Sequence, residues 1–444
     1  MIQVQRVHAS RPSHRAYVSV LDFLRNTLLG RFYLSYLRQY APIRTTVIWS
    51  WKNLLVLITY TYSKFKHSKF KLLSDIADNQ VLVYPKQTAL VCMSDVYPNE
   101  KSGTIKMPAS YEFPEVFVTT ISNATVTGLS NFVHTNQAII GHNLFRISHD
   151  YTSEELHGRL YVNAKEQLVT RLSSIKTGVT IDQGVLFTDA VSTNYAHFMT
   201  ELLPKVFAYT QSHPNKATPL IIDYELHINL MQALEMVVGE DAQLIGLEKG
   251  EPLQVKSLQV VSACGYVPFE RRLRTNHFTD HSHGVFSPSA LFGMRDLIKS
   301  KVAKLSSNTE ANATHKKIWI KRNATYRNVS NADEIQSALI TQGFMVIEPE
   351  KLSFVEQVTI FSNADVIVGA TGAAFANLIF CKPETKIIVL ISDYKNMIYG
   401  YWPNMASAVG NKVTYVIGEC ADASSRLHSN FQIDLPDLLD AISD

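Results

Sequence analysis

A run of small residues between two β-branched segments is the first candidate for a binding site. It follows an expected strand at 364–368 and precedes another at 386–391. Glycines without a Cβ let a ligand approach the backbone closely, and a helix beginning there presents free N–H groups and a partial positive charge. An anion is therefore the expected ligand, although small residues could instead serve to pack the helix on its sheet. The run includes Gly369, Thr371, Gly372, Ala373 and Ala374.

Two arginines, Arg322 and Arg327, follow the first expected strand of the C-terminal half. The loops after parallel strands meet at one edge of an α/β sheet, so this loop should converge with 348–353 and 369–377. Guanidinium groups bind phosphate oxygens through paired hydrogen bonds, so the three loops together predict a nucleoside-diphosphate site. The alternative is that both arginines pair with surface acids. The same loops also contain Asn328 and Glu348.

His197 and Glu201 are four residues apart, so on a helix they share one face. An imidazole beside a carboxylate is a general-base arrangement, in which either group accepts a proton and the other orients it. A surface ion pair is the alternative. The neighbouring apolar side chains, such as Phe198 and Leu202, predict that the pair is partly buried and therefore functional.

A polar segment at 269–283 carries three histidines, His277, His281 and His283. Three close histidines are compatible with a metal site. Because the segment has no fixed helical register and no acidic or cysteine partner beyond Asp280, a solvated loop or a segment lining the substrate site is the favoured interpretation.

The organisation of the chain favours an α/β fold. Its 444 residues exceed one ordinary hydrophobic core, and expected strands alternate with helices in both halves. A polar linker at 305–312 separates an N-terminal α/β domain, 81–305, from a C-terminal one, 313–444. Within the first, a β-rich insertion is expected to include separate strands at 116–121 and 124–129. The four cysteines lie far apart, which indicates neither a zinc site nor a disulfide framework and fits a reducing compartment.

The first 80 residues are expected to form a basic, helical extension, in contrast to the rest of the chain. Residues 1–74 contain twelve Lys/Arg and one acid, Asp22, with aromatic residues interleaved. That composition suits an anionic membrane surface, so we expect peripheral attachment through residues 1–72. Whether 45–62 spans the membrane or lies on it stays open.

Nucleic acid could bind the same positive charges. However, the sequence contains no recognised nucleic-acid-binding module, so no nucleic-acid partner is expected. No secretory signal is present in the first 30 residues, so the expected location is cytoplasmic, at the inner face of the plasma membrane.

Three motifs in order resemble glycosyltransferase family 61, in particular its bacterial capsular-polysaccharide branch. They are N-Y-A-H-F-x-x-E-x-L-P at 194–204, R-N-x-x-x-R-x-x-x-N at 322–331 and G-A-x-G-A-A-x-x-N-x-x-F-x-x-P at 369–383. The resemblance extends over roughly 108–416. It implies a GT-B architecture of two facing Rossmann-like domains, a nucleotide-sugar donor held by the C-terminal one, and metal-independent transfer with inversion at the anomeric carbon.

The resemblance also assigns roles to residues. The donor phosphates would be held by Arg322, Arg327 and the segment 372–377, which includes Asn377. Thr371 stands where the family often has histidine. The acidic position is favoured as the base, but the choice between the two dyad residues stays open. The residues facing the acceptor would be Asn194, Tyr195, His197 and Glu201.

The sequence thus predicts an inverting enzyme that moves a hexosyl, N-acetylhexosaminyl or pentosyl group from a nucleoside-diphosphate donor to a hydroxyl of a surface or capsular polysaccharide. No cofactor and no metal are expected, which agrees with the absence of a D-x-D motif. The alternative is a non-catalytic nucleotide-sugar-binding or scaffold subunit of a membrane-associated assembly. A dinucleotide oxidoreductase is disfavoured because no G-x-G-x-x-G follows a strand.

Overall fold

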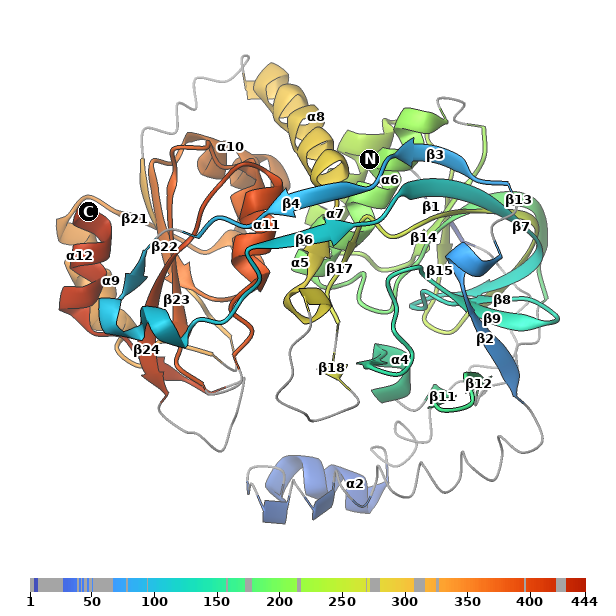
Figure 1. Ribbon diagram of the computed structural model, residues 1–444, viewed down its shortest axis with the longest axis horizontal. Helices are drawn as coiled ribbons and strands as arrows, with labels where there is room; N and C mark the ends of the chain where they lie inside the picture. The colour runs from blue at the N-terminus through green and yellow to red at the C-terminus, as the bar shows by residue number, and fades with distance from the viewer. Residues whose placement is uncertain are drawn as a thin grey trace.

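The computed structural model confirms a mixed α/β fold with one large sheet in each half of the chain (Figure 1). The residues that the structure describes are 4–6, 27–37, 40, 42–43, 46–47, 50, 67–76, 79–93, 95–156, 159–171, 178–213, 217–268, 270–271, 280–306, 316–324, 327–394, 397–420 and 429–444.

The N-terminal sheet has twelve strands in the order β1-β15-β14-β13-β16-β7-β8-β9-β2-β12-β11, with β3 also paired to β7. Strands β1, β15, β14, β13 and β16 are parallel, whereas β16 and β7 are antiparallel. The strand direction therefore changes between β16 and β7, and the chain leaves the parallel strand β13 toward the His197 helix. The strands are β1 Val4–Arg6, β2 Ser68–Leu72, β3 Val81–Tyr84, β7 Val116–Thr127, β8 Val133–His134, β9 Ala138–Gly141, β11 Leu160–Asn163, β12 Leu168–Arg171, β13 Thr180–Phe187, β14 Leu220–Asp223, β15 Leu244–Leu247 and β16 Pro252–Val261.

The C-terminal sheet has five parallel strands in the order β21-β20-β22-β23-β24. The strand order reverses between β20 and β22, and in open α/β sheets ligands bind outside the carboxyl ends of strands at such a point. Strand β25 pairs antiparallel and β5 parallel with β24. The strands are β5 Val96–Tyr97, β20 Lys317–Ile320, β21 Met345–Ile347, β22 Val366–Ala370, β23 Lys386–Ser392, β24 Thr414–Cys420 and β25 Phe431–Gln432.

Helices cover both sheets, and three short strand pairs complete the described part of the chain. The pairs are β4 Gln87–Leu90 with β6 Ser110–Phe113, β10 Asp150–Tyr151 with β18 Glu270–Arg271, and β17 Gly265–Tyr266 with β19 Val285–Phe286. The α-helices are α2 Leu28–Phe32, α4 Ser153–Leu156, α5 Tyr195–His197, α6 Leu203–Ser212, α7 Ile228–Val238, α8 Pro288–Ser306, α9 Ala332–Thr341, α10 Phe354–Asn363, α11 Tyr401–Ala408 and α12 Leu435–Ser443. Two π-helices, Tyr33–Leu37 and Phe198–Leu202, and five 3₁₀ helices, Leu73–Asp75, Asn99–Thr104, Asp280–His283, Pro349–Lys351 and Ala373–Phe380, lie between them.

Helix α8 joins the two halves. It packs on α6 and α7 of the N-terminal half and on α10 of the C-terminal half, and Figure 1 shows it between them. One hydrophobic cluster contains buried residues of both sheets, for example Val185 and Val389. Strand β5 crosses the division expected at 305–312, because it belongs by sequence to the first half and pairs with β24 of the second.

The β-rich region differs from the expectation of separate strands at 116–121 and 124–129. Strand β7 runs unbroken through both, because it pairs along its length with β16. The break expected at Asn123 is instead a positive-φ residue, with φ of 52°, inside the strand. Pairing with a long neighbour outweighs the local turn preference of asparagine.

The first 80 residues are not only a helical extension. Strands β1 and β2 come from this stretch and join the N-terminal sheet, so that part of the expectation is wrong. Helix α2 and the π-helix Tyr33–Leu37 lie apart from both sheets in Figure 1 and expose large apolar side chains, including Leu28 and Leu29. Most of 45–62 lies outside the described residues. Within the part that is described, no helix combines the length and apolar character needed to cross a membrane.

Candidate active site

The His197–Glu201 pair is held at the start of the helical segment that follows β13. Asn194 caps helix α5 by accepting a hydrogen bond from the N–H of Ala196 at 3.0 Å, so its side-chain oxygen serves the helix start. Glu201 lies in the π-helix that follows, and such widened turns often occur at functional sites. The sequence thus predicted the shared face of the two residues but not the π-helical turn.

Glu201 is buried, His197 is partly buried, and the two are directly bonded. Nδ1 of His197 hydrogen-bonds to Oε1 of Glu201, and only 6% of Glu201 is exposed. Burial lowers the pKa of His197, but the charge and hydrogen bond of Glu201, together with the charge of Asp189, outweigh it and raise that pKa. A raised pKa favours the protonated imidazole beside the carboxylate of Glu201.

The second carboxylate oxygen of Glu201 is oriented by the backbone. Oε2 accepts the N–H of Val267 at 3.2 Å, just after β17. That approach requires Gly265, because a Cβ there would lie 2.1 Å from the carbonyl oxygen of Thr200 in the π-helix. The glycine therefore lets β17 come close enough to fix the carboxylate.

Two further carboxyl groups lie at strand ends: Asp189 follows β13 by two residues, and Asp223 is the last residue of β14. Both are buried, and Asp223 accepts the N–H of Asp189 at 2.9 Å. Burial raises the pKa of Asp189, and it raises the pKa of Asp223 to about 7. Sequence reasoning missed both residues. Their position at the carboxyl ends of apolar strands was the signal that could have found them.

The two candidate donor arginines lie together at the carboxyl end of β20. A Cβ on Gly372 would stand 1.9 Å from Nη1 of Arg322, so the guanidinium lies against the small-residue loop only because that residue is glycine. Burial lowers the pKa of Arg322, and the positive charge of Arg327 lowers it further. The buried Nε of Arg327 has no hydrogen-bond partner among the residues that the structure describes. Arg327 also has a left-handed backbone, with φ of 59°. Two partly buried like charges of this kind favour an anionic ligand.

A cavity of about 150 Å³, lined by Arg322 but not by Arg327, opens at the reversal of strand order between β20 and β22. It lies on the edge of the sheet where the sequence predicted ligand binding. Its lining contains Trp319, Ile320, Lys321, Arg322, Asn323, Asn328, Val329, Ala332, Asp333, Gln336 and Ala370.

Two other candidate donor residues have protein partners. Glu348 bonds to Lys351 at 2.8 Å and to Asn323, so its side chain holds the loop next to the cavity. The amide of Asn328 donates to the carbonyl of Ala324 at 2.7 Å, while its buried oxygen has no hydrogen-bond partner among the described residues. Asn328 lines the cavity, whereas Glu348 does not.

The small-residue loop begins a 3₁₀ helix, Ala373–Phe380, rather than an α-helix. Gly369 packs on Ile320, since a Cβ there would lie 2.9 Å from the Ile320 Cβ. Thr371 accepts a hydrogen bond from the indole N–H of Trp402 at 2.9 Å. Ala373 and Ala374 pack against the main hydrophobic cluster. The side chains of this loop thus serve packing, and its backbone and the two arginines are left to face a ligand.

Tyr195 and Asn377 join the two halves at the site. The phenol of Tyr195 donates to Oδ1 of Asn377 at 2.5 Å, and the amide of Asn377 donates to Gln357 at 2.8 Å. Asn377 is completely buried. The candidate acceptor residue and the candidate donor residue are therefore in direct contact.

Tyr401, which the sequence did not single out, lies between the two sets of residues. Burial raises its pKa, with a further contribution from Glu201, while a hydrogen bond to Thr200 and the charge of Arg327 oppose the rise. The preceding N–H, on Gly400, donates to Nδ1 of His283 at 3.2 Å. A tyrosine at the start of a helix carries no sequence signal for such a role.

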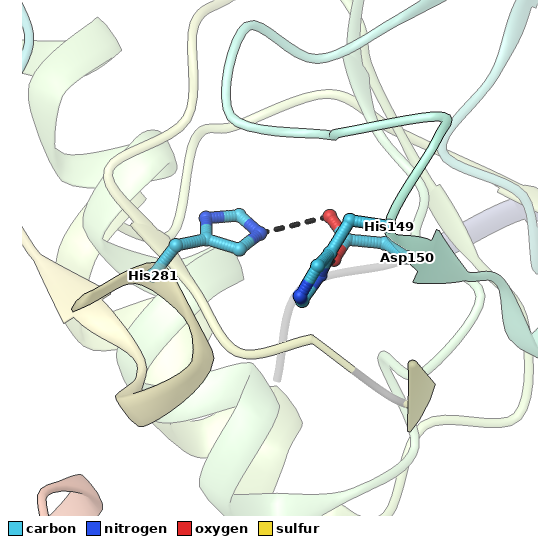
Figure 2. Close-up of side chains that lie close together, drawn as sticks. All are labelled: His149, Asp150 and His281. Atoms are coloured by element: carbon cyan, nitrogen blue, oxygen red, sulfur yellow. Dashed lines mark hydrogen bonds and ion pairs between the residues drawn. The ribbon is translucent and has the colours of Figure 1, made fainter. Parts of the chain in front are cut away.

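His281 and His283 do not belong to a solvated loop, so that part of the expectation is wrong for both, while a segment lining the substrate site stays a prediction. They are 3% and 4% exposed, because the 3₁₀ helix that carries them packs against β10 and the start of α11. His277 lies outside the described residues. Figure 2 shows His281 facing Asp150, with Nε2 2.8 Å from Oδ2, and His149 beside the same carboxylate. The acidic partner thus comes from a strand far away in the sequence.

Comparison with known proteins confirms the family resemblance. The model of the family described as Glycosyltransferase 61 matches residues 195–388, which include the His197–Glu201 pair, both arginines and the small-residue loop. No curated protein matches the chain. The match over residues 195–388 supports glycosyltransferase family 61 and, with it, a glycosyltransferase activity.

Proposed function

We propose that the protein is an inverting glycosyltransferase that moves a sugar from a nucleoside-diphosphate donor to a hydroxyl of a bacterial surface or capsular polysaccharide. The observation that carries the proposal is the contact between the helical segment of Glu201 and the 3₁₀ helix Ala373–Phe380 beside the arginine loop, made through Tyr195 and Asn377. It brings a proton acceptor and two cations to one place, as transfer from a phosphate leaving group requires.

The arginine loop is the proposed donor site. Arg322 and Arg327 would face the diphosphate, and the cavity beside them would hold another part of the nucleotide. Guanidinium groups aimed at the departing phosphate stabilise the negative charge that develops there. In this proposal they do the work that a metal ion does in other transferases. The two-sheet arrangement around the site supports a GT-B architecture for the molecule.

Glu201 is the proposed general base. The acceptor oxygen forms a bond to the anomeric carbon on one face while the bond from that carbon to the phosphate oxygen breaks on the other, which inverts the configuration. The hydroxyl proton passes to the Glu201 carboxylate, and the nucleoside diphosphate leaves. His197, protonated and bonded to Oε1, would orient the carboxylate. The donor is proposed to carry a hexosyl, N-acetylhexosaminyl or pentosyl group.

The test is a donor panel assayed for transfer to short polysaccharide acceptors. We expect one nucleotide sugar to be consumed, with a product of inverted configuration, and no requirement for added magnesium or manganese. Glu201→Gln should lower kcat by roughly a hundredfold or more without changing donor affinity. Arg327→Ala should weaken both donor binding and turnover. Near-normal transfer by both variants would overturn these roles.

The second candidate is a non-catalytic nucleotide-sugar-binding subunit, favoured by the number of candidate residues that serve packing. It predicts donor binding by thermal shift with no consumption of any donor, with or without acceptor. Attachment to the inner face of the plasma membrane through residues 1–72 is part of the proposal in either case. It rests on the basic composition of that region and the exposed apolar side chains of α2.

A further inference from the structure

We propose that His149, Asp150 and His281 form a binding site for one divalent transition-metal ion, with zinc as the ion that suits them best. The potential ligand atoms of the three residues all lie within 4.8 Å of one another (Figure 2). Imidazole nitrogen and carboxylate oxygen are typical zinc ligands, and three protein ligands leave a fourth position for water.

The carboxylate of Asp150 lies between the two imidazoles. Oδ1 is 2.8 Å from Nδ1 of His149, and Oδ2 is 2.8 Å from Nε2 of His281. Zinc with bonds of roughly 2.0–2.2 Å places neighbouring ligand atoms about 3.3 Å apart. Each nitrogen–oxygen pair would therefore open by about half an ångström, which small side-chain rotations supply. The ion would take the place of the hydrogen atoms that now join the imidazole nitrogens to the carboxylate oxygens.

Burial and charge both favour a cation here. The side chain of Asp150 is 0% exposed and that of His281 is 2%, whereas that of His149 is 17% exposed. The side chains that hydrogen-bond Asp150 among the described residues are His149, His281 and Tyr266, and none carries a fixed positive charge. A divalent ion would neutralise the buried carboxylate, and the partly exposed His149 marks the side from which the ion and a water could enter.

The surroundings orient the carboxylate as the outer shell of a metal site does. Oδ2 accepts the phenol of Tyr266 at 3.1 Å and the backbone N–H of Arg146 at 2.9 Å. The next residue after Tyr266 is Val267, whose N–H holds Glu201. The ion would thus tie β10 to the 3₁₀ helix Asp280–His283 and brace the strand that orients Glu201. It would act as a structural brace, and the proposed transfer passes through no metal.

The experiment measures metal content and affinity in the full chain without an affinity tag. The protein is stripped with a chelator, dialysed and titrated with zinc chloride by calorimetry, and bound zinc is counted by mass spectrometry. We expect one zinc per chain and a melting temperature that rises with zinc. Asp150→Asn and His281→Gln should each weaken binding at least tenfold. His134→Gln is the matched control, because His134 is a buried histidine bonded to Arg171 outside the cluster, and it should bind as the wild type does.

Less than half an equivalent of zinc in the wild type, or unchanged binding in both ligand variants, would overturn the proposal in favour of a simple hydrogen-bonded bridge. Should the buried variants fold poorly, His149→Gln at the more exposed ligand and cobalt binding to the wild type decide the question. Cobalt in this site should give visible absorption bands of a low-coordinate complex, and their absence counts against the site. Because no readout is glycosyl transfer, a failure here leaves the proposed function standing.

Discussion

At the residue scale, the site depends on side chains whose charges are set by burial and by one another. His197 has a raised pKa because Glu201 and Asp189 surround it. Arg322 and Arg327 lie close together, and burial and then the charge of Arg327 lower the pKa of Arg322. Such arrangements cost free energy in the absence of a substrate, which is typical of sites that bind charged ligands.

The stability contributed by His197 should depend on pH with a definite sign. Its pKa in the folded protein is raised above 6.5, so the contribution is fully present below about pH 6.5 and is lost as pH rises through the folded pKa. His197→Gln should therefore cost roughly 1–3 kcal/mol of unfolding free energy at low pH and less at high pH. Urea unfolding between about pH 6 and pH 9 measures the difference.

His134→Gln is the control for which we expect the opposite pH dependence of stability. Burial, and then the charge of Arg171, hold the pKa of His134 well below its usual value. The contribution of His134 is therefore present above about pH 6.5 and is lost as pH falls. If the two variants showed the same pH trend, the raised pKa of His197 would be wrong.

Tyr401 should act as a positioning residue that links the base to the donor arginines. Tyr401→Phe removes the phenol that bonds to Thr200 next to Glu201 and faces Arg327. We expect kcat to fall roughly fivefold to tenfold with little change in donor KM, since a neutral hydrogen bond is worth about 1 kcal/mol. Tyr399→Phe, which removes a buried phenol bonded to the Ser392 carbonyl, should leave kcat unchanged. Equal effects of the two variants would indicate a general packing role.

At the scale of elements, short segments with little intrinsic preference for a regular helix or strand position the side chains of the site. The π-helix Phe198–Leu202 turns Glu201 toward β17, and β17 reaches it only through Gly265. Gly372, the residue just before the 3₁₀ helix Ala373–Phe380, lies against Arg322. The long helices and strands support these segments rather than supply the reactive groups.

Gly265→Ala should test this coupling. The added methyl group would meet the Thr200 carbonyl oxygen at 2.1 Å, so β17 must move away and Val267 should lose its bond to Glu201. We expect a loss of about 1–3 kcal/mol in stability together with a lower kcat. Gly343→Ala, at a glycine with no atom within 4 Å of the added methyl but with positive φ, is a control for backbone strain alone and should keep normal kcat. A stable Gly265→Ala enzyme with normal kcat would contradict the coupling.

At the scale of the whole molecule, the site lies where two sheets meet. Helix α8 packs on both halves, and α11 carries Tyr401 and Trp402 to opposite sides of the junction. The N-terminal sheet also takes up β1 and β2, which flank the basic region. That region is therefore anchored to the catalytic body at both ends.

The exposed apolar side chains of α2 should bind an anionic membrane. Leu28 and Leu29 are 90% and 82% exposed, and basic residues surround them in the sequence. The double variant Leu28→Glu, Leu29→Glu should lose at least tenfold in affinity for vesicles containing phosphatidylglycerol, measured by sedimentation. Ile340→Glu, at an exposed apolar position on α9, should bind as the wild type does. Equal binding to neutral vesicles would exclude the electrostatic part of this prediction.

The sequence by itself determined the α/β class, the polarity of the basic region and the candidate residues in three motifs, because periodicity, charge and spacing are local properties. It could not place Asp150 beside His281, Tyr401 beside Glu201 or Asp189 beside His197, since these neighbours come from segments far apart in the chain. From the sequence we also expected two strands where β7 is one, because pairing with β16 overrides the local turn preference. We expected His281 to be solvated, whereas it is buried because it packs on Asp150. The tertiary structure decided which polar groups are buried away from water. This burial shifts their pKa values and thereby sets the charges of the site residues.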